Sequence, residues 1–173
     1  INWVAELAGD ANGRSKRITG SMQDITQLKQ AEALIEYQRY HDALTRLPNR
    51  RFFIERLATL IEDLDVGRRL GVIAMDLDRF KIINESLGAA KGDRILQHIA
   101  ERLTRLVPNE EQVARIGGDE FGILIERQGG VARIDHLAED LRTLIGQPCE
   151  IDGEVLYLTA SLGIALCPTD GLE

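Results

Sequence analysis

Hydrophobic positions along the chain alternate between helical and strand patterns. Apolar side chains recur every three or four residues over residues 49–64, 93–107 and 131–146, which predicts amphipathic helices, with a shorter one over residues 79–88. Residues 70–78 form a nearly continuous apolar run that ends in acids, as is typical of a buried central strand. Hairpins are expected over residues 113–126 and 149–166, the second turning at Asp152 and Gly153. This order predicts an α/β domain of the α+β kind, with a mixed central sheet flanked by helices.

The first 42 residues follow a different pattern. Residues 1–26 predict an N-terminal β-hairpin around the turn-forming stretch GDANGR, and two strands do not make a stable domain alone. Residues 27–42 predict a linker helix with apolar residues on one side, namely Leu28, Ala31, Leu34 and Ile35. That side fits equally well with pairing in a dimer and with packing on its own domain. The expected organisation is therefore a partial N-terminal unit at residues 1–26, a linker helix at residues 27–42 and a compact domain at residues 43–173.

Composition and charge narrow the functional classes. The chain is 44% hydrophobic with a formal net charge of -7, which suits a globular domain and argues against a nucleic-acid-binding surface. No apolar run approaches the ~20 residues of a membrane helix, and no signal peptide opens the chain. The two cysteines, Cys149 and Cys167, fit a reducing compartment, so a cytoplasmic location is expected, with membrane tethering of a longer parent protein left open. The scattered histidines show no metal-ligand spacing, so each is expected on a helix surface or in a core position where its hydrogen bonds are satisfied: His41, His98 and His136.

Four acidic residues fall at the ends of predicted strands. Asp76 and Asp78 end the central strand, while Asp119 and Glu120 follow two glycines at the tip of a hairpin. Carboxylates that meet at the end of a sheet repel one another unless a cation lies between them. Oxygen ligands without His or Cys select Mg²⁺ or Mn²⁺, and two such ions about 4 Å apart would serve phosphoryl transfer. The alternative is an ordinary glycine turn and a helix cap.

Three motifs in the same order resemble a GGDEF domain of the diguanylate cyclase family: DALTRLPNRR (residues 42–51), MDLDRFKIINESLGAAKGD (75–93) and RIGGDEF (115–121). The resemblance covers residues 42–173. It implies a palm-like nucleotidyl cyclase fold, and a homodimer that condenses two GTP molecules into cyclic di-GMP and pyrophosphate.

Residues 1–26 resemble the end of a PAS sensor domain, which would make residues 27–42 a signalling helix. The chain also resembles GGDEF domains that occur in tandem with an EAL phosphodiesterase domain. In such proteins the cyclase half can be a catalytically silent, GTP-binding regulator, so this alternative stays open.

The resemblance implies roles for individual residues. Asp76 and Asp119 would bind metal through their carboxylates, and Leu77 would do so through its backbone carbonyl. Asp119 would also accept the proton of the 3′-hydroxyl, with Glu120 part of the same active site. Lys81 would stabilise charge on the phosphates.

Further matches concern the substrate. Asn84 and Asp93 match positions that bind guanine, where an amide meets O6 and a carboxylate accepts from N1 and N2. Asp93 could equally be the N-cap of the next helix. Other implied substrate-binding residues are Arg102, Gly117 and Gly118.

The chain also departs from the family pattern. Glu85 stands where the family often has an aspartate, and Ala89 stands where it often has a histidine. The product-inhibition motif Arg-x-x-Asp is missing, because the aligned residues 108–111 read PNEE, so feedback inhibition through that site is not expected. The family continues with a helix whose basic residues serve the triphosphate, whereas the present sequence ends at Glu173.

Overall fold

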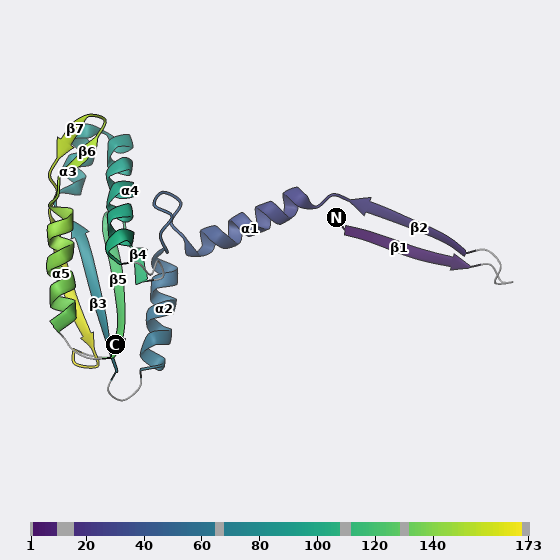
Figure 1. Cartoon of the computed structure of the whole chain (residues 1–173). Helices are drawn as coiled ribbons and strands as arrows, with labels where there is room; N and C mark the ends of the chain where they lie inside the picture. Colours follow the sequence, from purple (N-terminus) through teal and green to yellow (C-terminus); the bar gives the residue numbers. More distant parts are fainter. Residues whose placement is uncertain (1, 10–15, 65–67, 108–111, 129–131, 171–173) are drawn as a thin grey trace. The chain divides into compact units, whose positions relative to one another are not determined.

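The structure is a computed structural model that describes residues 2–9, 16–64, 68–107, 112–128 and 132–170 (Figure 1). Contacts within the chain divide it into two compact units, Ile1–Arg39 and Tyr40–Glu173. None of the helices in the described ranges is long and apolar enough to cross a bilayer.

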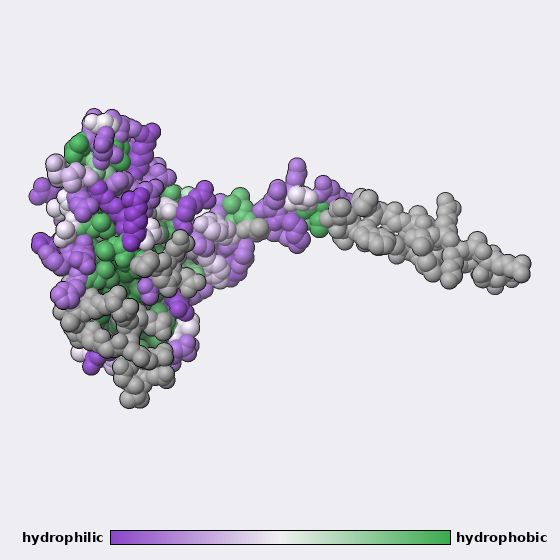
Figure 2. All heavy atoms as spheres, in the orientation of Figure 1, coloured by the Kyte–Doolittle hydropathy of each residue, from purple (hydrophilic) through white to green (hydrophobic). Residues whose placement is uncertain are grey.

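The first unit contains a hairpin and a helix. Strand β1 (Asn2–Gly9) pairs antiparallel with β2 (Lys16–Gln23), which confirms the predicted hairpin, while its turn at residues 10–15 lies outside the described residues. Helix α1 (Thr26–Tyr40) follows, and Figure 2 shows hydrophobic and hydrophilic residues side by side along it. Its large apolar side chains are exposed: Leu28 at 56%, Leu34 at 52% and Ile35 at 67%. The apolar side of this helix is therefore open to solvent in a single chain.

The second unit is built on a four-stranded sheet in the order β4-β5-β3-β8 (Figure 1). A helix, α2 (Arg50–Glu62), precedes the sheet in the sequence. The sheet strands and the helices between them are, in chain order, β3 (Arg68–Leu77), α3 (Phe80–Leu87), α4 (Ala89–Leu106), β4 (Val113–Arg115), β5 (Glu120–Gln128), α5 (Ala132–Ile145) and β8 (Ala160–Cys167). A separate small hairpin joins α5 to β8 and consists of β6 (Cys149–Ile151) and β7 (Glu154–Leu156).

The α+β class and the helices flanking the sheet are confirmed, but the strand directions differ from the expected mixture. Within the described residues, every strand pair of this sheet is antiparallel, and a parallel pairing occurs as an isolated bridge between Asn49 and Arg115. The reason is topological. Each helical crossover, β3 to β4 and β5 to β8, leaves one strand between the two strands that it connects, so the parallel partners never touch.

Both faces of the sheet are covered by helices. Alternate residues of β3 point to opposite faces. Ile73 and Met75 pack with the buried apolar residues of α4 and α5, whereas Leu70 packs with those of α2. The buried residues predicted for α4 are confirmed at Ile95, Leu96, Ile99 and Leu103. Burying each such side chain stabilises the fold by about 1.5–3 kcal/mol.

Local chain signals fix the ends of the elements. Asn49 caps α2, because its side chain accepts a hydrogen bond of 3.1 Å from the backbone N–H of Phe52. Asp152 and Gly153 form the predicted two-residue turn, with φ angles of 53° and 79°. This turn sets the register of the β6–β7 hairpin.

Candidate active site

The acidic end of β3 lies beside the tip of the β4–β5 hairpin. Asp76 stands opposite Glu120 in the register of β3 with β5. The backbone N–H of Leu77 donates to the carbonyl of Asp119 over 3.3 Å. The structure thus brings together the two acidic segments that lie more than forty residues apart in the sequence.

The electrostatics of these acids fit a cation site. Desolvation and the nearby charges of Asp119 and Glu120 raise the pKa of Asp76 above its usual value, and Asp78 adds to this effect. Among the described residues, no three His, Cys, Asp or Glu side chains together form a metal-binding group. The ligand set implied by the sequence is of another kind, with two carboxylates and the carbonyl of Leu77. A divalent ion between the carboxylates would relieve the repulsion that raises this pKa.

Asp78 occupies a different environment from Asp76. Its carboxylate accepts hydrogen bonds from the hydroxyls of Thr159, over 2.6 Å, and Ser161, over 2.7 Å. These bonds hold the pKa of Asp78 below its usual value. Its backbone N–H also donates to the carbonyl of Thr159 over 2.9 Å. Asp78 therefore joins the end of β3 to the start of β8, a contact that the sequence analysis missed, although the Thr-x-Ser spacing was a possible signal.

The two glycines of the signature loop serve different purposes. A side chain at Gly117 would overlap with the carboxylate of Glu120. At Gly118 no atom lies within 4 Å of the place that a Cβ would take, and the residue is exposed. Gly118 thus leaves room for a ligand to approach the backbone.

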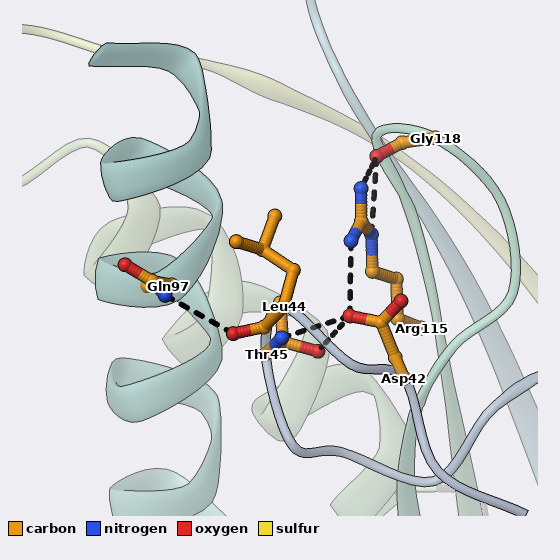
Figure 3. A network of polar contacts seen from close by, with 6 residues as sticks. All are labelled: Asp42, Leu44, Thr45, Gln97, Arg115 and Gly118. Carbon is orange, nitrogen blue, oxygen red and sulfur yellow. Dashed lines mark hydrogen bonds and ion pairs between the residues drawn. The ribbon is translucent and has the colours of Figure 1, made fainter. Parts of the chain in front are cut away.

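A polar network holds the signature loop against the segment that precedes α2 (Figure 3). The guanidinium of Arg115 donates to the carbonyl of Gly118 over 2.7 and 3.2 Å and to Asp42 over 2.9 Å. Asp42 also accepts from the backbone N–H and the hydroxyl of Thr45, over 2.8 and 2.7 Å. The side chains of Arg115 and Asp42 are only 13% and 25% exposed. Sequence reasoning noticed both motifs but not this pairing.

The predicted guanine residues lie where α3 meets α4. Asn84 is on α3 and Asp93 on the first turns of α4, whose N-cap is Gly88. The N-cap alternative for Asp93 is wrong, because the helix begins four residues earlier than the hydrophobic pattern predicted. The Oδ1 atom of Asn84 is buried and lacks a hydrogen-bond partner among the described residues. A Cβ at Gly92 would overlap with this amide, so Gly92 determines where it lies.

The two predicted cationic residues have contrasting surroundings. Lys81 on α3 is exposed and lies 4.0 Å from Glu85. Arg102 on α4 is only 9% exposed, and its guanidinium donates to the backbone carbonyls of Leu144, Gln147 and Pro148. The guanidinium of Arg102, which the resemblance implies would contact substrate, is therefore already engaged by backbone carbonyls. Its contact with substrate stays a prediction.

Other sequence expectations have mixed outcomes. The Nε2 atom of His98 is buried without a hydrogen-bond partner in the described part, so it is not the satisfied core position that was one of its two expected settings. His136 is exposed, as expected for a helix surface. Residues 108–111, where the product-inhibition motif would fall, lie outside the described residues.

A cleft opens beside the acidic end of the sheet. Its volume is about 710 Å³, a size that suits a nucleotide. Its lining includes Asp76, Asp78 and Arg79 from the end of β3, together with Tyr157 and Thr159 from the segment before β8. Arg79 has a left-handed backbone with a φ of 59°. The acids therefore border a cavity large enough for a substrate.

Comparison with known proteins agrees with this geometry. The family model described as "Diguanylate cyclase, GGDEF domain" matches residues 39–173. Two Pseudomonas aeruginosa proteins are similar: the bifunctional diguanylate cyclase/cyclic di-GMP phosphodiesterase MucR, 41% identical over 84% of this chain, and the cyclic di-GMP phosphodiesterase NbdA, 38% identical over 85%. The chain spans 21% and 19% of their respective lengths.

A solved structure shows the same fold. The GGDEF domain of TpbB, also from Pseudomonas aeruginosa, superposes with a TM-score of 0.71 at 38% sequence identity. The match covers 76% of this chain and 79% of that one. With the family model covering most of the chain and the acidic signature placed at the end of the sheet, the chain belongs to the GGDEF-domain family of diguanylate cyclases.

Proposed function

We propose that the domain binds GTP in the cleft beside Asp76 and condenses two GTP molecules into cyclic di-GMP. In each half-reaction the 3′-oxygen of one GTP bonds to the α-phosphorus of the other, and pyrophosphate leaves. One GTP is held by each protomer of a homodimer. The observation that carries this proposal is the meeting of Asp76 with Asp119 and Glu120 at the end of the sheet, where Asp76 also lines a nucleotide-sized cleft.

The acids have separate tasks in this proposal. Asp76 and Asp119 hold a divalent ion, Mg²⁺ or Mn²⁺, together with the carbonyl of Leu77. When bound, such an ion supplies charge stabilisation on the phosphates and activates the attacking hydroxyl. Asp119 accepts the proton of that 3′-hydroxyl. Glu120, opposite Asp76 in the strand register, belongs to the same acidic group.

The remaining residues bind and orient the nucleotide. Asn84 and Asp93 recognise guanine through their amide and carboxylate, which complement its O6, N1 and N2 atoms. Lys81 provides positive charge for the phosphates, and its exposure at the start of α3 leaves it accessible. Gly118 permits close approach to the backbone. The Arg115 network keeps the signature loop in place during these contacts.

A second candidate function is a catalytically silent, GTP-binding domain that regulates a neighbouring EAL phosphodiesterase domain. It is supported by the similarity to NbdA, which is named as a cyclic di-GMP phosphodiesterase and is far longer than this chain. The N-terminal hairpin and α1 are proposed to be the end of a PAS sensor and its signalling helix. Both candidates require the same nucleotide cleft, and they differ only in turnover.

One experiment separates the two functions. The complete protein is incubated with GTP and Mg²⁺, nucleotide binding is measured by calorimetry, and products are separated by chromatography. Appearance of cyclic di-GMP and pyrophosphate supports the cyclase. Binding of GTP without product supports the regulatory domain, and absence of binding rejects both. Substituting Mn²⁺ for Mg²⁺ and adding a chelator tests the requirement for a divalent ion.

A further inference from the structure

One side of α4 carries basic residues that all contact the same stretch of chain. Lys91, Arg94 and Arg102 are spaced by three and eight residues, which places them on one side of the helix. Their partners all lie between the last turn of α5 and β7. The stretch that leads from α5 to β8, residues 146–159, is called the α5–β8 connection below.

Arg102 anchors the start of this connection. The side chain is nearly buried and donates to the carbonyls of Leu144 and Gln147, over 3.1 and 3.0 Å, and to that of Pro148. Leu144 lies in the last turn of α5, where carbonyls have no partner within the helix and a buried cation complements the helix dipole, whereas Gln147 and Pro148 lie just after the helix. Arg102 thus fixes the point at which the chain leaves α5.

Two ion pairs anchor the tip of the β6–β7 hairpin. The Nζ of Lys91 lies 2.8 Å from the carboxylate of Glu154, and Arg94 pairs with Asp152 in the turn. Lys91 is the more enclosed of the two cations, at 25% exposure. Figure 1 shows the hairpin beside the N-terminal end of α4, the end that carries Asp93.

The far end of the connection forms a wall of the nucleotide cleft. Tyr157, Leu158 and Thr159 line that cleft together with Asp76. Thr159 also bonds to Asp78 through both its hydroxyl and its carbonyl. A displacement of the hairpin from α4 would therefore move a wall of the cleft and loosen the contact with Asp78.

We infer that Lys91, Arg94 and Arg102 are positioning residues that hold the α5–β8 connection in the place where it shapes the nucleotide cleft. They act through the connection, and none of the three lines the cleft. The inference rests on the proposed function only in taking GTP as the occupant of the cleft. It gives Arg102 a task different from the substrate contact implied by the sequence.

The Lys91–Glu154 pair allows a test by charge exchange in the complete protein. K91E and E154K each place like charges at the contact, and the double variant restores opposite charges. Each single variant is expected to raise the Kd and KM for GTP about threefold, with kcat changed less than twofold, and the double variant to return towards wild type. The Arg105–Glu101 pair, exposed on the same helix at 3.7 Å, provides the matched control variants R105E and E101K, which should leave these constants unchanged.

Hydrogen exchange supplies a readout that does not depend on GTP. The backbone N–H of Asp78 donates to Thr159, so its protection should fall in K91E and E154K, recover in the double variant and stay unchanged in the controls. R102K, which keeps the charge but loses the planar fork, should lower the same protection.

The outcomes separate this inference from the proposed function. Unchanged protection at Asp78 in the single variants, or failure of the double variant to recover, would overturn the positioning role. Absence of GTP binding by the wild-type protein would reject the proposed function, while the exchange measurements would still decide the role of α4.

Discussion

At the scale of single residues, the two acids at the end of β3 differ in their surroundings and therefore in the direction in which their pKa values are shifted. Asp76 and Asp78 lie two residues apart, yet desolvation and neighbouring acids raise the pKa of the first, and hydroxyl donors lower that of the second. A carboxylate that already accepts two hydrogen bonds within the protein is suited to hold β3 against β8. One surrounded by other acids is suited to bind a cation.

The first prediction concerns Asp119. D119A should lower cyclic di-GMP synthesis at least a hundredfold, because it removes the residue proposed as both a metal carboxylate and the proton acceptor. The free energy of unfolding should change by less than about 0.5 kcal/mol, since a partly exposed residue of a turn contributes little to the core. Chromatography and urea denaturation measure the two quantities, with D140A on the exposed side of α5 as control. Wild-type synthesis in D119A would contradict the assignment.

The second prediction concerns Gly92 and the amide that it accommodates. G92A should displace the side chain of Asn84 and raise the KM for GTP about tenfold, the loss expected for a nucleobase hydrogen bond. Alanine is also a better helix former than glycine, so the helix itself should not be weakened.

A double-mutant cycle isolates this effect. In the N84A background, G92A should have no further effect on the KM, because the displaced group is already gone. Equal effects of G92A in both backgrounds would show that Gly92 acts by another route.

At the scale of elements, two short connections set the geometry of the site. The segment before α2 reaches the signature loop through Asp42 and Arg115, and the α5–β8 connection reaches β3 through Thr159. The sheet alone fixes the strand ends, whereas these connections fix the loops that carry the proposed ligand-binding groups. Changes in either should therefore affect substrate binding or turnover before they unfold the core.

The third prediction uses the pH dependence of the Asp42 contact. Burial opposes ionisation, but the bonds from Thr45 and Arg115 outweigh it and hold the pKa of Asp42 below its usual value. The stabilisation is thus present above the unfolded-state pKa of about 3.9 and is lost as the pH falls through the lower folded-state value. D42N should cost roughly 1–3 kcal/mol at pH 7, and this difference should shrink below about pH 4.

Urea denaturation of wild type and D42N at several pH values measures this difference. E55Q, in an exposed pair with Arg51, is a suitable control, because exposed pairs contribute little. A difference between wild type and D42N that stays constant from pH 7 to pH 3 would show that the charge of Asp42 contributes nothing to stability.

At the scale of the whole molecule, sequence patterns predicted most elements and the meeting of two acidic segments. The apolar run of residues 70–78 that ends in acids and the glycine turn before Asp119 were sufficient to predict this meeting, and the strand register places Asp76 opposite Glu120. The contacts of Asp42, Arg102 and Asp78 were not predictable in this way. Each joins residues at least 42 positions apart through side-chain geometry, and even the Thr-x-Ser spacing at residues 159–161 marks two hydroxyl donors without indicating the acid that they contact. The start of α4 was misjudged because its first turn, AAKG, lacks large apolar side chains.

The fourth prediction concerns assembly through α1. Its exposed Leu34 and Ile35 are suited to pairing with a second copy of the chain, which synthesis from two bound GTP molecules requires. The double variant L34Q/I35Q keeps helix-forming residues but removes the apolar surface, so the dimer dissociation constant should rise at least tenfold. Cyclic di-GMP synthesis should fall most at low protein concentration, while GTP binding per chain should not change.

Sedimentation and activity at several protein concentrations measure this, with the polar substitution E36Q on the same helix as control. A variant that remains dimeric and active at low concentration would show that α1 does not mediate assembly.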